Sequence, residues 1–356
     1  MLTTLLATCI LAQPQPVPAR IVILQTPGEA DPRLQYRVNS EKLSSPQMSP
    51  KHNWQFDYLC ASYGRVQGPP EPFRLKFRVF SQYRKGANDP GERATRMLIR
   101  LWDFNVQRLK LDHADQYEGI VDAYLCFGGE AGGEQLFDTE QRGGRTVHVN
   151  TMYLYDVSNL SESLEFAREL AHEYGHASLP PIGRFNEPEY WANGHLGERL
   201  YLTWAYRALK SGHLKPEDFG GSTPEQLKAY LDVNVTPLVE SAFKTGPTPA
   251  LLKDSSAKGM NHYLGLMLVA ERVLPKSVFA QGLKLAPDDS AEGAVKGLKQ
   301  AVQDSTTYTW DAKEKVGTQV WIPMGSGKVT GAKVVQKRLG WAQVLVMKPL
   351  VTISGS

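Results

Sequence analysis

The sequence predicts an α+β fold: a small mixed sheet, then a mostly helical stretch, then a small β module. Alternating apolar and basic residues over 75–80, and β-forming residues over 120–127 and 145–155, predict strands. Apolar residues then recur at helical spacing through much of 188–302. From Val316 onward, short runs rich in Val, Ile and Trp are separated by Gly or Pro, which is typical of short strands.

The other elements before the helical stretch have weaker signals. We expect a strand over 21–24 and a loop over 27–50, which is rich in Pro, Ser and Asn. A helix is expected over 89–109, because Asp89-Pro90-Gly91-Glu92 provides a cap, a first-turn proline and a capping box. The glycine-rich stretch 128–133 is expected to be a flexible hairpin connection.

The second half of the chain is expected to contain helices and then strands. The predicted helices span about 188–209, 224–233, 236–243, 259–273 and 291–302. The predicted strands of the β module span 320–324, 332–337, 342–347 and 350–353.

Composition excludes several classes of function. The chain has 356 residues, of which 42% are hydrophobic and 22% charged, as in a soluble globular protein. The net charge of +3, with no Lys/Arg block, argues against a nucleic-acid partner. No apolar run reaches the roughly 18 residues that a membrane-spanning helix needs.

The N-terminal segment resembles a secretory signal. Residues 1–12 are apolar apart from threonines, and a Pro/Gln stretch follows, so we expect a signal peptide over 1–19 and a secreted or periplasmic protein. The alternative is a frayed apolar terminus. Without this segment Cys60 and Cys126 remain, and they are either a disulfide or two buried thiols.

One motif carries chemistry. His172-Glu173-Tyr174-Gly175-His176 matches H-E-x-x-H, in which two histidines four residues apart lie on one face of a helix and can reach one metal ion. Glu173 is rotated about 100° from His172, so it can flank the ion without being a ligand and can accept a proton from water.

The sequence around the motif supports a helix. Asn159 and Glu162 can form a capping box, and Pro180 ends the helix soon after the motif. Apolar residues form a stripe on the face away from the histidines, namely Leu164, Ala167, Ala171 and Tyr174. The alternative interpretation is a pair of surface histidines beside a carboxylate.

A catalytic zinc site needs a third protein ligand and an open position. The candidates downstream of His176 are Glu187, Glu189, His195 and Glu198. We favour Glu198 over Glu189 and His195, because a site with one carboxylate placed in the middle of a helix fits best, and the twenty-two positions after His176 leave room for a second helix to return across the first.

The strands, the H-E-x-x-H helix and a following helix with a glutamate resemble the zincin metallopeptidases, and within them the gluzincins. Over about 75–275, this resemblance implies one Zn²⁺ held by His172, His176 and Glu198. It also implies that Glu173 is the general base in the hydrolysis of a peptide or protein substrate. Many gluzincins carry an acidic residue one turn after the ligand glutamate, but here Leu202 stands there, so that orienting role is unfilled or comes from elsewhere in the chain.

The resemblance implies two further features of a peptidase site. Tyr263, or its neighbour His262, is the candidate for stabilising the oxyanion, with core packing as the alternative for Tyr263. An edge strand should border the cleft and pair with an extended substrate, and 124–129 or 145–150 is the expected edge.

These predictions divide the chain into a signal peptide over 1–19, an N-terminal extension over 20–74, a zincin-like catalytic domain over 75–305 and a β module over 306–356. Two alternatives remain open at this point. The chain could be an exported zincin-like binding protein without catalysis, or its zinc could be structural, with a fourth protein ligand.

Overall fold

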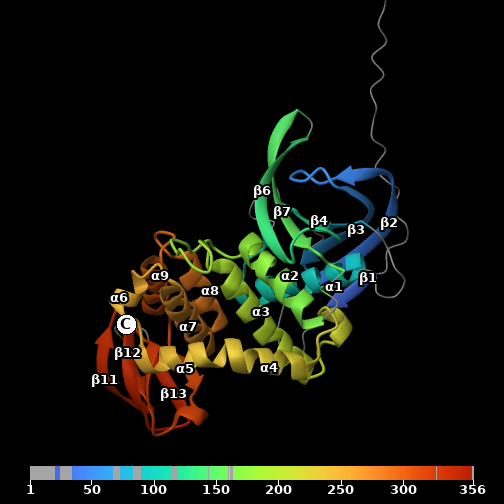
Figure 1. The fold of residues 1–356 in the computed structure, drawn as a ribbon. Coiled ribbons are helices and arrows are strands. Elements are labelled where there is room, and N and C mark those ends of the chain that lie inside the picture. Colours follow the sequence, from blue (N-terminus) through green and yellow to red (C-terminus); the bar gives the residue numbers. More distant parts are fainter. Residues whose placement is uncertain are drawn as a thin grey trace, which may run out of the picture.

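The computed structural model describes residues 21–24, 34–66, 73–82, 90–113, 119–142, 144–158, 160, 163–325 and 327–354. The expected signal peptide over 1–19, the Asp89 cap, and the Asn159 and Glu162 capping residues lie outside these ranges. Figure 1 shows an N-terminal mixed sheet, a helical middle and small antiparallel sheets near the C-terminus. The predicted α+β class is therefore confirmed.

The N-terminal sheet has the strand order β1-β2-β3-β4-β5-β7-β6. Its strands are β1 (Ile21–Leu24), β2 (Leu34–Met48), β3 (Gln55–Val66), β4 (Arg74–Ser81), β5 (Val121–Leu125), β6 (Gly132–Arg142) and β7 (Arg145–Tyr155). Strands β4, β5 and β7 run parallel to one another, and the other pairs are antiparallel. The strands predicted over 21–24, 75–80, 120–127 and 145–155 are confirmed.

The prediction of a loop over 27–50 is wrong, because β2 occupies residues 34–48 and pairs antiparallel with β3. The register shifts between Lys42 and Gln47, and Pro46 falls inside this irregularity. A bulge accommodates a residue that cannot donate a ladder hydrogen bond. Pairing with β3 thus makes a strand from a polar sequence that has no strand pattern of its own.

The predicted sheet edge is also wrong. Strand β5 contains the first two residues of 124–129 and β7 contains all of 145–150, and each of these strands lies between two other strands. The outermost strand on this side of the described sheet is β6, which begins with the last two residues of the glycine-rich stretch and pairs antiparallel with β7. The hairpin is formed by β6 and β7, and the glycine-rich stretch leads into its first arm; the prediction that this stretch connects a hairpin is wrong, because β5 and β6 are not neighbours.

Helices α1 (Pro90–Phe104) and α2 (Ser163–Ser178) pack against the sheet (Figure 1). Helix α1 continues into one π-helical turn, η2 (Asn105–Leu109), as the helix predicted over 89–109 requires. The later helices are α3 (Asn193–Lys210), η5 (Pro216–Asp218), α4 (Pro224–Asn234), α5 (Thr236–Thr245), α6 (Pro249–Leu252), α7 (Ala257–Val273), α8 (Lys276–Lys284) and α9 (Ala291–Gln303).

The five predicted later helices are all present, whereas α6 and α8 were not predicted. Helix α3 begins at Asn193, five residues later than expected, so residues 188–192 belong to a loop. Among the helices that the structure describes, none combines the length and the apolar character needed to cross a membrane.

The C-terminal module consists of two three-stranded sheets, ordered β10-β13-β8 and β11-β12-β9. Its elements are β8 (Tyr308–Asp311), η6 (Lys313–Lys315), β9 (Gln319–Pro323), β10 (Lys328–Thr330), β11 (Ala332–Arg338), β12 (Trp341–Val346) and β13 (Leu350–Ser354). Strand β9 packs on α5, α7 and α9, so the module adjoins the helical part (Figure 1). The four predicted strands are confirmed, and β8 and β10 were missed.

Cys60 and Cys126 are buried thiols that no disulfide joins. Cys60 belongs to the main core between the sheet and the helices, whereas Cys126 packs in a separate cluster with Phe80, Tyr124 and Tyr153. Their side chains lie in different cores, so the buried-thiol alternative is the one that the structure shows.

A buried polar network connects α2 to strand β4 through His113. His113 lies 2.9 Å from the Tyr174 hydroxyl through Nδ1 and 3.1 Å from the Lys76 carbonyl through Nε2. Because the carbonyl can only accept, Nε2 carries the proton and Nδ1 accepts from Tyr174. Burial lowers the pKa of His113 to about 4, although the nearby Asp112 opposes this shift. Both ring nitrogens are thus used by a neutral imidazole.

The neutral His113 should make stability depend on pH. Its folded pKa lies below the ordinary value of about 6.5, so the unfolded chain binds a proton in acid that the folded chain does not. Stability should therefore fall as the pH drops from about 6.5 to 4. Urea unfolding at pH 7.5 and at pH 4.5 measures the free energy of unfolding at each pH. We expect this free energy to decrease from pH 7.5 to pH 4.5 by about 2 kcal/mol less in His113→Gln than in the wild type. Equal losses would contradict this account.

Candidate metal centre

Helices α2 and α3 touch through glycine backbones beside the motif. A Cβ added to Gly175 would lie 2.7 Å from the Asn193 carbonyl oxygen, and one added to Gly197 would lie 2.5 Å from the Gly175 Cα. Residues with side chains could not take these places without moving a helix. The contact brings the first turns of α3 against the turn of α2 that carries the motif.

The loop from Leu179 to Ala192 is fixed by residues far along the chain. The Gly183 amide donates to the Asp289 carbonyl at 2.8 Å, and the Asn186 amide donates to the Ser255 carbonyl at 2.7 Å. Phe185 is buried beneath the loop. These contacts place Glu189 opposite the two histidines of α2.

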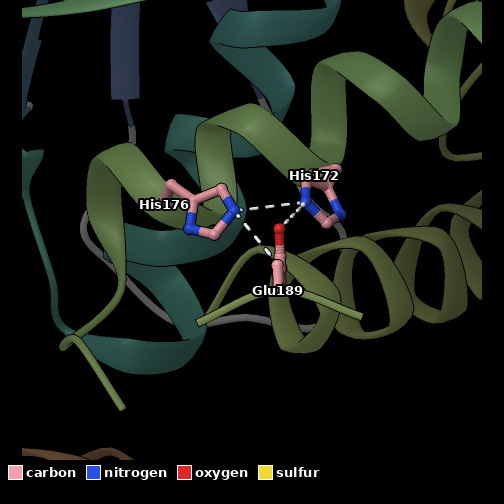
Figure 2. Close-up of side chains that lie close together, drawn as sticks. All are labelled: His172, His176 and Glu189. Carbon is pink, nitrogen blue, oxygen red and sulfur yellow. Dashed lines mark hydrogen bonds and ion pairs between the residues drawn. The ribbon is translucent and has the colours of Figure 1, made fainter. Parts of the chain in front are cut away.

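His172, His176 and Glu189 converge on one point (Figure 2). The two Nε2 atoms lie 3.1 Å apart. Oε2 of Glu189 lies 3.3 Å from Nε2 of His172, and Oε1 of Glu189 lies 3.5 Å from Nε2 of His176. Two ligands each about 2.05 Å from a tetrahedral zinc ion are about 3.3 Å apart. The two histidine contacts run to different oxygens of Glu189, and each is close to this spacing, so the three side chains could share one ion.

Gly194 keeps the space between these donors open. A Cβ at this position would lie 2.2 Å from Nε2 of His176 and 2.7 Å from Nε2 of His172. In addition, Oε1 of Glu189 is buried and has no hydrogen-bond partner among the described atoms. A cation between the donors would satisfy this oxygen, so the residues present fit a metal ion.

The outer nitrogens of both imidazole rings have their own partners. His176 Nδ1 lies 3.0 Å from the side-chain oxygen of Asn193, which can only accept, so Nδ1 carries the proton. His172 Nδ1 lies 3.6 Å from Oε2 of Glu198, whose other oxygen accepts a hydrogen bond from Arg168 at 2.8 Å. Such partners orient metal-binding histidines and leave Nε2 available as the ligand.

The predicted ligand set requires Glu198 to meet both histidines of the motif, but Glu198 does not form such a group with them. It forms a second group, with His172 and His195, that could also hold a metal ion. It contacts His172 on the side away from His176, because it lies on the second turn of α3 behind that ring. Glu189 precedes the helix and reaches the two facing Nε2 atoms instead.

Glu173 is the most buried carboxylate of the motif region, with 3% of its surface exposed. It packs against Gly133 of β6, where an added Cβ would lie 2.6 Å from its Cγ. Burial, helped by the neighbouring carboxylates Glu169 and Glu189, raises the pKa of Glu173 to about 8. A carboxylate with a pKa near neutrality is suited to accept and return a proton.

The carboxylates around His172 favour positive charge between the rings. Burial disfavours charge on the ring, but the contacts with Glu189 and Glu198 outweigh burial and raise the pKa of His172 to about 10. Burial likewise opposes the charge of Glu189, yet its contacts with His172 and His176 lower its pKa well below the usual range. The same preference would stabilise a bound cation.

A cavity of about 620 Å³ opens over these residues. Strand β6 borders it with residues 132–137, α2 forms its floor, and residues 189–191 and the start of α3 close the other side. The edge strand of the sheet therefore lies along the cavity, as expected for the cleft, although the strand is not the one predicted.

Tyr263 does not line this cavity. It is fully buried on α7, with its ring 6.2 Å from that of Phe185, so it packs beneath the loop that carries Glu189. His262 accepts a hydrogen bond from the Thr248 amide at 3.1 Å. The roles of Asn193 and Gly194 were missed, although Asn-Gly directly before His195 was a visible signal of a special backbone position.

Replacing Gly194 by alanine should close the ion position. The new methyl group would occupy the space between the two Nε2 atoms, so we expect metal affinity to fall at least about tenfold while the fold is retained. Titration with Co²⁺, followed by absorbance, measures this. Gly128→Ala is the matched control, because nothing lies within 4 Å of a Cβ there. Equal affinity in both variants would refute the role of Gly194.

Comparisons with protein-family models, curated proteins and solved structures find no match to this chain. Its own geometry shows a His172, His176 and Glu189 group able to hold a metal ion, beside a buried carboxylate at the floor of a cavity.

Proposed function

We propose that the chain is a zinc-dependent peptidase in which His172, His176 and Glu189 hold one Zn²⁺ and Glu173 is the general base. The observation that carries this proposal is that the two Nε2 atoms and the Glu189 carboxylate lie close enough together to share one ion, beside a buried carboxylate. Two imidazoles and one carboxylate suit zinc, and the candidate groups among the described residues contain three donors each, which leaves a position open.

A bound zinc ion supplies Lewis acidity, which makes water nucleophilic at neutral pH and polarises a carbonyl group. In the proposed reaction, water attacks the carbonyl carbon of the peptide and Glu173 takes one of its protons. Glu173 then delivers this proton to the amide nitrogen as the carbon–nitrogen bond breaks. The products are a carboxylic acid and an amine. Glu173 lines the cavity directly beside His172, so one carboxylate can perform both transfers.

The surroundings support a peptide substrate. Strand β6 lies at the edge of the described sheet and borders the cavity, so an extended peptide can pair with its backbone. Such pairing would hold the peptide across the floor, within reach of Glu173. The same backbone contacts would suit many sequences.

The proposed site differs in its third ligand from the one that the zincin resemblance implies. We propose Glu189, rather than Glu198, as the third ligand. Glu198 then supplies the carboxylate that orients the first histidine, a role for which Leu202 offers no acidic group. Tyr263 receives no catalytic role, and His195, which lines the cavity, is the candidate for stabilising the oxyanion.

Glu173→Gln tests the general base. The amide keeps the shape of the side chain but cannot accept a proton, so the variant should retain one zinc per chain. Its kcat/KM for peptide hydrolysis should fall at least about a hundredfold. Elemental analysis and a peptide cleavage assay measure the two quantities. Glu165→Gln, an exposed position on the same helix, is the control. Full activity of Glu173→Gln would refute the mechanism, and zinc binding without hydrolysis in the wild type would indicate a binding protein.

Glu189 and Glu198 should differ in their effects on zinc. Removal of a ligand in Glu189→Ala should reduce the zinc content below one per chain. Loss of an orienting carboxylate charge in Glu198→Gln should keep one zinc per chain but weaken binding about 10- to 100-fold. Competition with a chelator measures both affinities. The reverse result would assign the ion to the His172, His195 and Glu198 group.

A further inference from the structure

Exposed aromatic side chains gather at the cavity. Among the described residues, the large hydrophobic side chains that are exposed include three aromatic ones, Phe137, Tyr190 and Trp191, with 49%, 51% and 39% of their surface accessible. All three line the cavity above the motif. Aromatic surface left in water is unfavourable, and its concentration at one opening is typical of a binding site.

The three aromatic residues lie toward the same end of the cavity. Gly133 packs on Glu173, and Asn150, which pairs with Phe137 in the β-ladder, donates a hydrogen bond to the Ala177 carbonyl at 2.8 Å. Strand β6 therefore runs along α2 from the motif toward the C-terminal end of the helix. Phe137 lies at that end, where the chain leaves α2 for the loop that carries Tyr190 and Trp191.

The loop aromatics have fixed positions. The Trp191 ring packs over Gly183, where an added Cβ would lie 2.5 Å from the ring, and the rings of Tyr190 and Trp191 meet edge to face at 4.7 Å between centroids. The Gly183 amide in turn donates a hydrogen bond to the Asp289 carbonyl. Aromatic rings fixed in advance lose little conformational entropy when a ligand covers them.

The opposite end of the cavity is charged. Arg168 and Glu169, on the turn of α2 before the motif, line it there, and Arg168 is paired with Glu198. The cavity thus offers an apolar end and a polar end on the two sides of the proposed zinc position. A peptide lying along β6 would meet both.

We propose that Phe137, Tyr190 and Trp191 form a subsite for one large apolar side chain, aromatic or branched aliphatic, of the peptide substrate beside the cleaved bond. The inference rests on the proposed function, because the subsite adjoins the proposed zinc ligand Glu189, which directly precedes Tyr190. The subsite makes the enzyme select peptides by an apolar residue on the side of the bond that faces the C-terminal end of α2.

Binding and cleavage are measured separately. Zinc-loaded Glu173→Gln is titrated with fluorescent peptides that differ only by Phe or Gly at one position, and the wild type is assayed for cleavage of the same peptides. We expect the Phe peptide to bind at least about tenfold more tightly than the Gly peptide. In the same background, Phe137→Ala and Trp191→Ala should each reduce this ratio at least threefold at unchanged zinc content. Val335→Ala and Leu350→Ala, exposed apolar positions in the β module, should leave it unchanged.

The outcomes separate the two proposals. Selective binding of the Phe peptide without cleavage by the wild type refutes the peptidase but supports the subsite. Cleavage with a ratio that survives both aromatic substitutions overturns the subsite and leaves the peptidase intact. A ratio near one in the unsubstituted background also overturns it, as does aromatic-dependent binding to phosphatidylcholine vesicles in place of peptides.

Discussion

The close contact between the backbones of α2 and α3 is the constraint on which the site depends. Gly175 lies inside the motif, and it meets Asn193 and Gly197 at distances that leave no room for a Cβ. Because the helices approach this closely, Asn193 can reach His176, and Glu198 can reach His172. A larger residue at the crossing would separate the histidines from the groups that orient them.

Three buried or half-buried carboxylates around two imidazoles divide their roles by environment. Glu189 and Glu198 face ring nitrogens or arginine, which hold the pKa of each well below its usual range against the effect of burial. Glu173 faces a glycine of β6 and has one oxygen without a hydrogen-bond partner among the described atoms, so burial dominates and raises its pKa. Neighbouring groups of one chemical type are thereby suited to different tasks, ligation and proton transfer.

Local patterns predicted the elements, and long-range contacts decided the details of the site. The motif helix, the strands over 75–80 and 145–155, and helices α4, α5, α7 and α9 follow from periodicity and caps, which a sequence displays directly. Which carboxylate faces the Nε2 atoms of both histidines depends on where α3 begins and on how it packs against α2. The edge position of β6 and the strand character of 34–48 depend on which strands become neighbours. Spacing along a chain carries no information about either.

The anchoring of the Glu189 loop has a consequence for the order of events during synthesis. The loop is tied to the Ser255 and Asp289 carbonyls, and Asp289 lies a hundred positions after Glu189 in the chain. A ribosome makes both histidines long before it makes these anchors. The nascent chain thus carries an incomplete set of His172, His176 and Glu189 donors until its helical half has been translated and has folded.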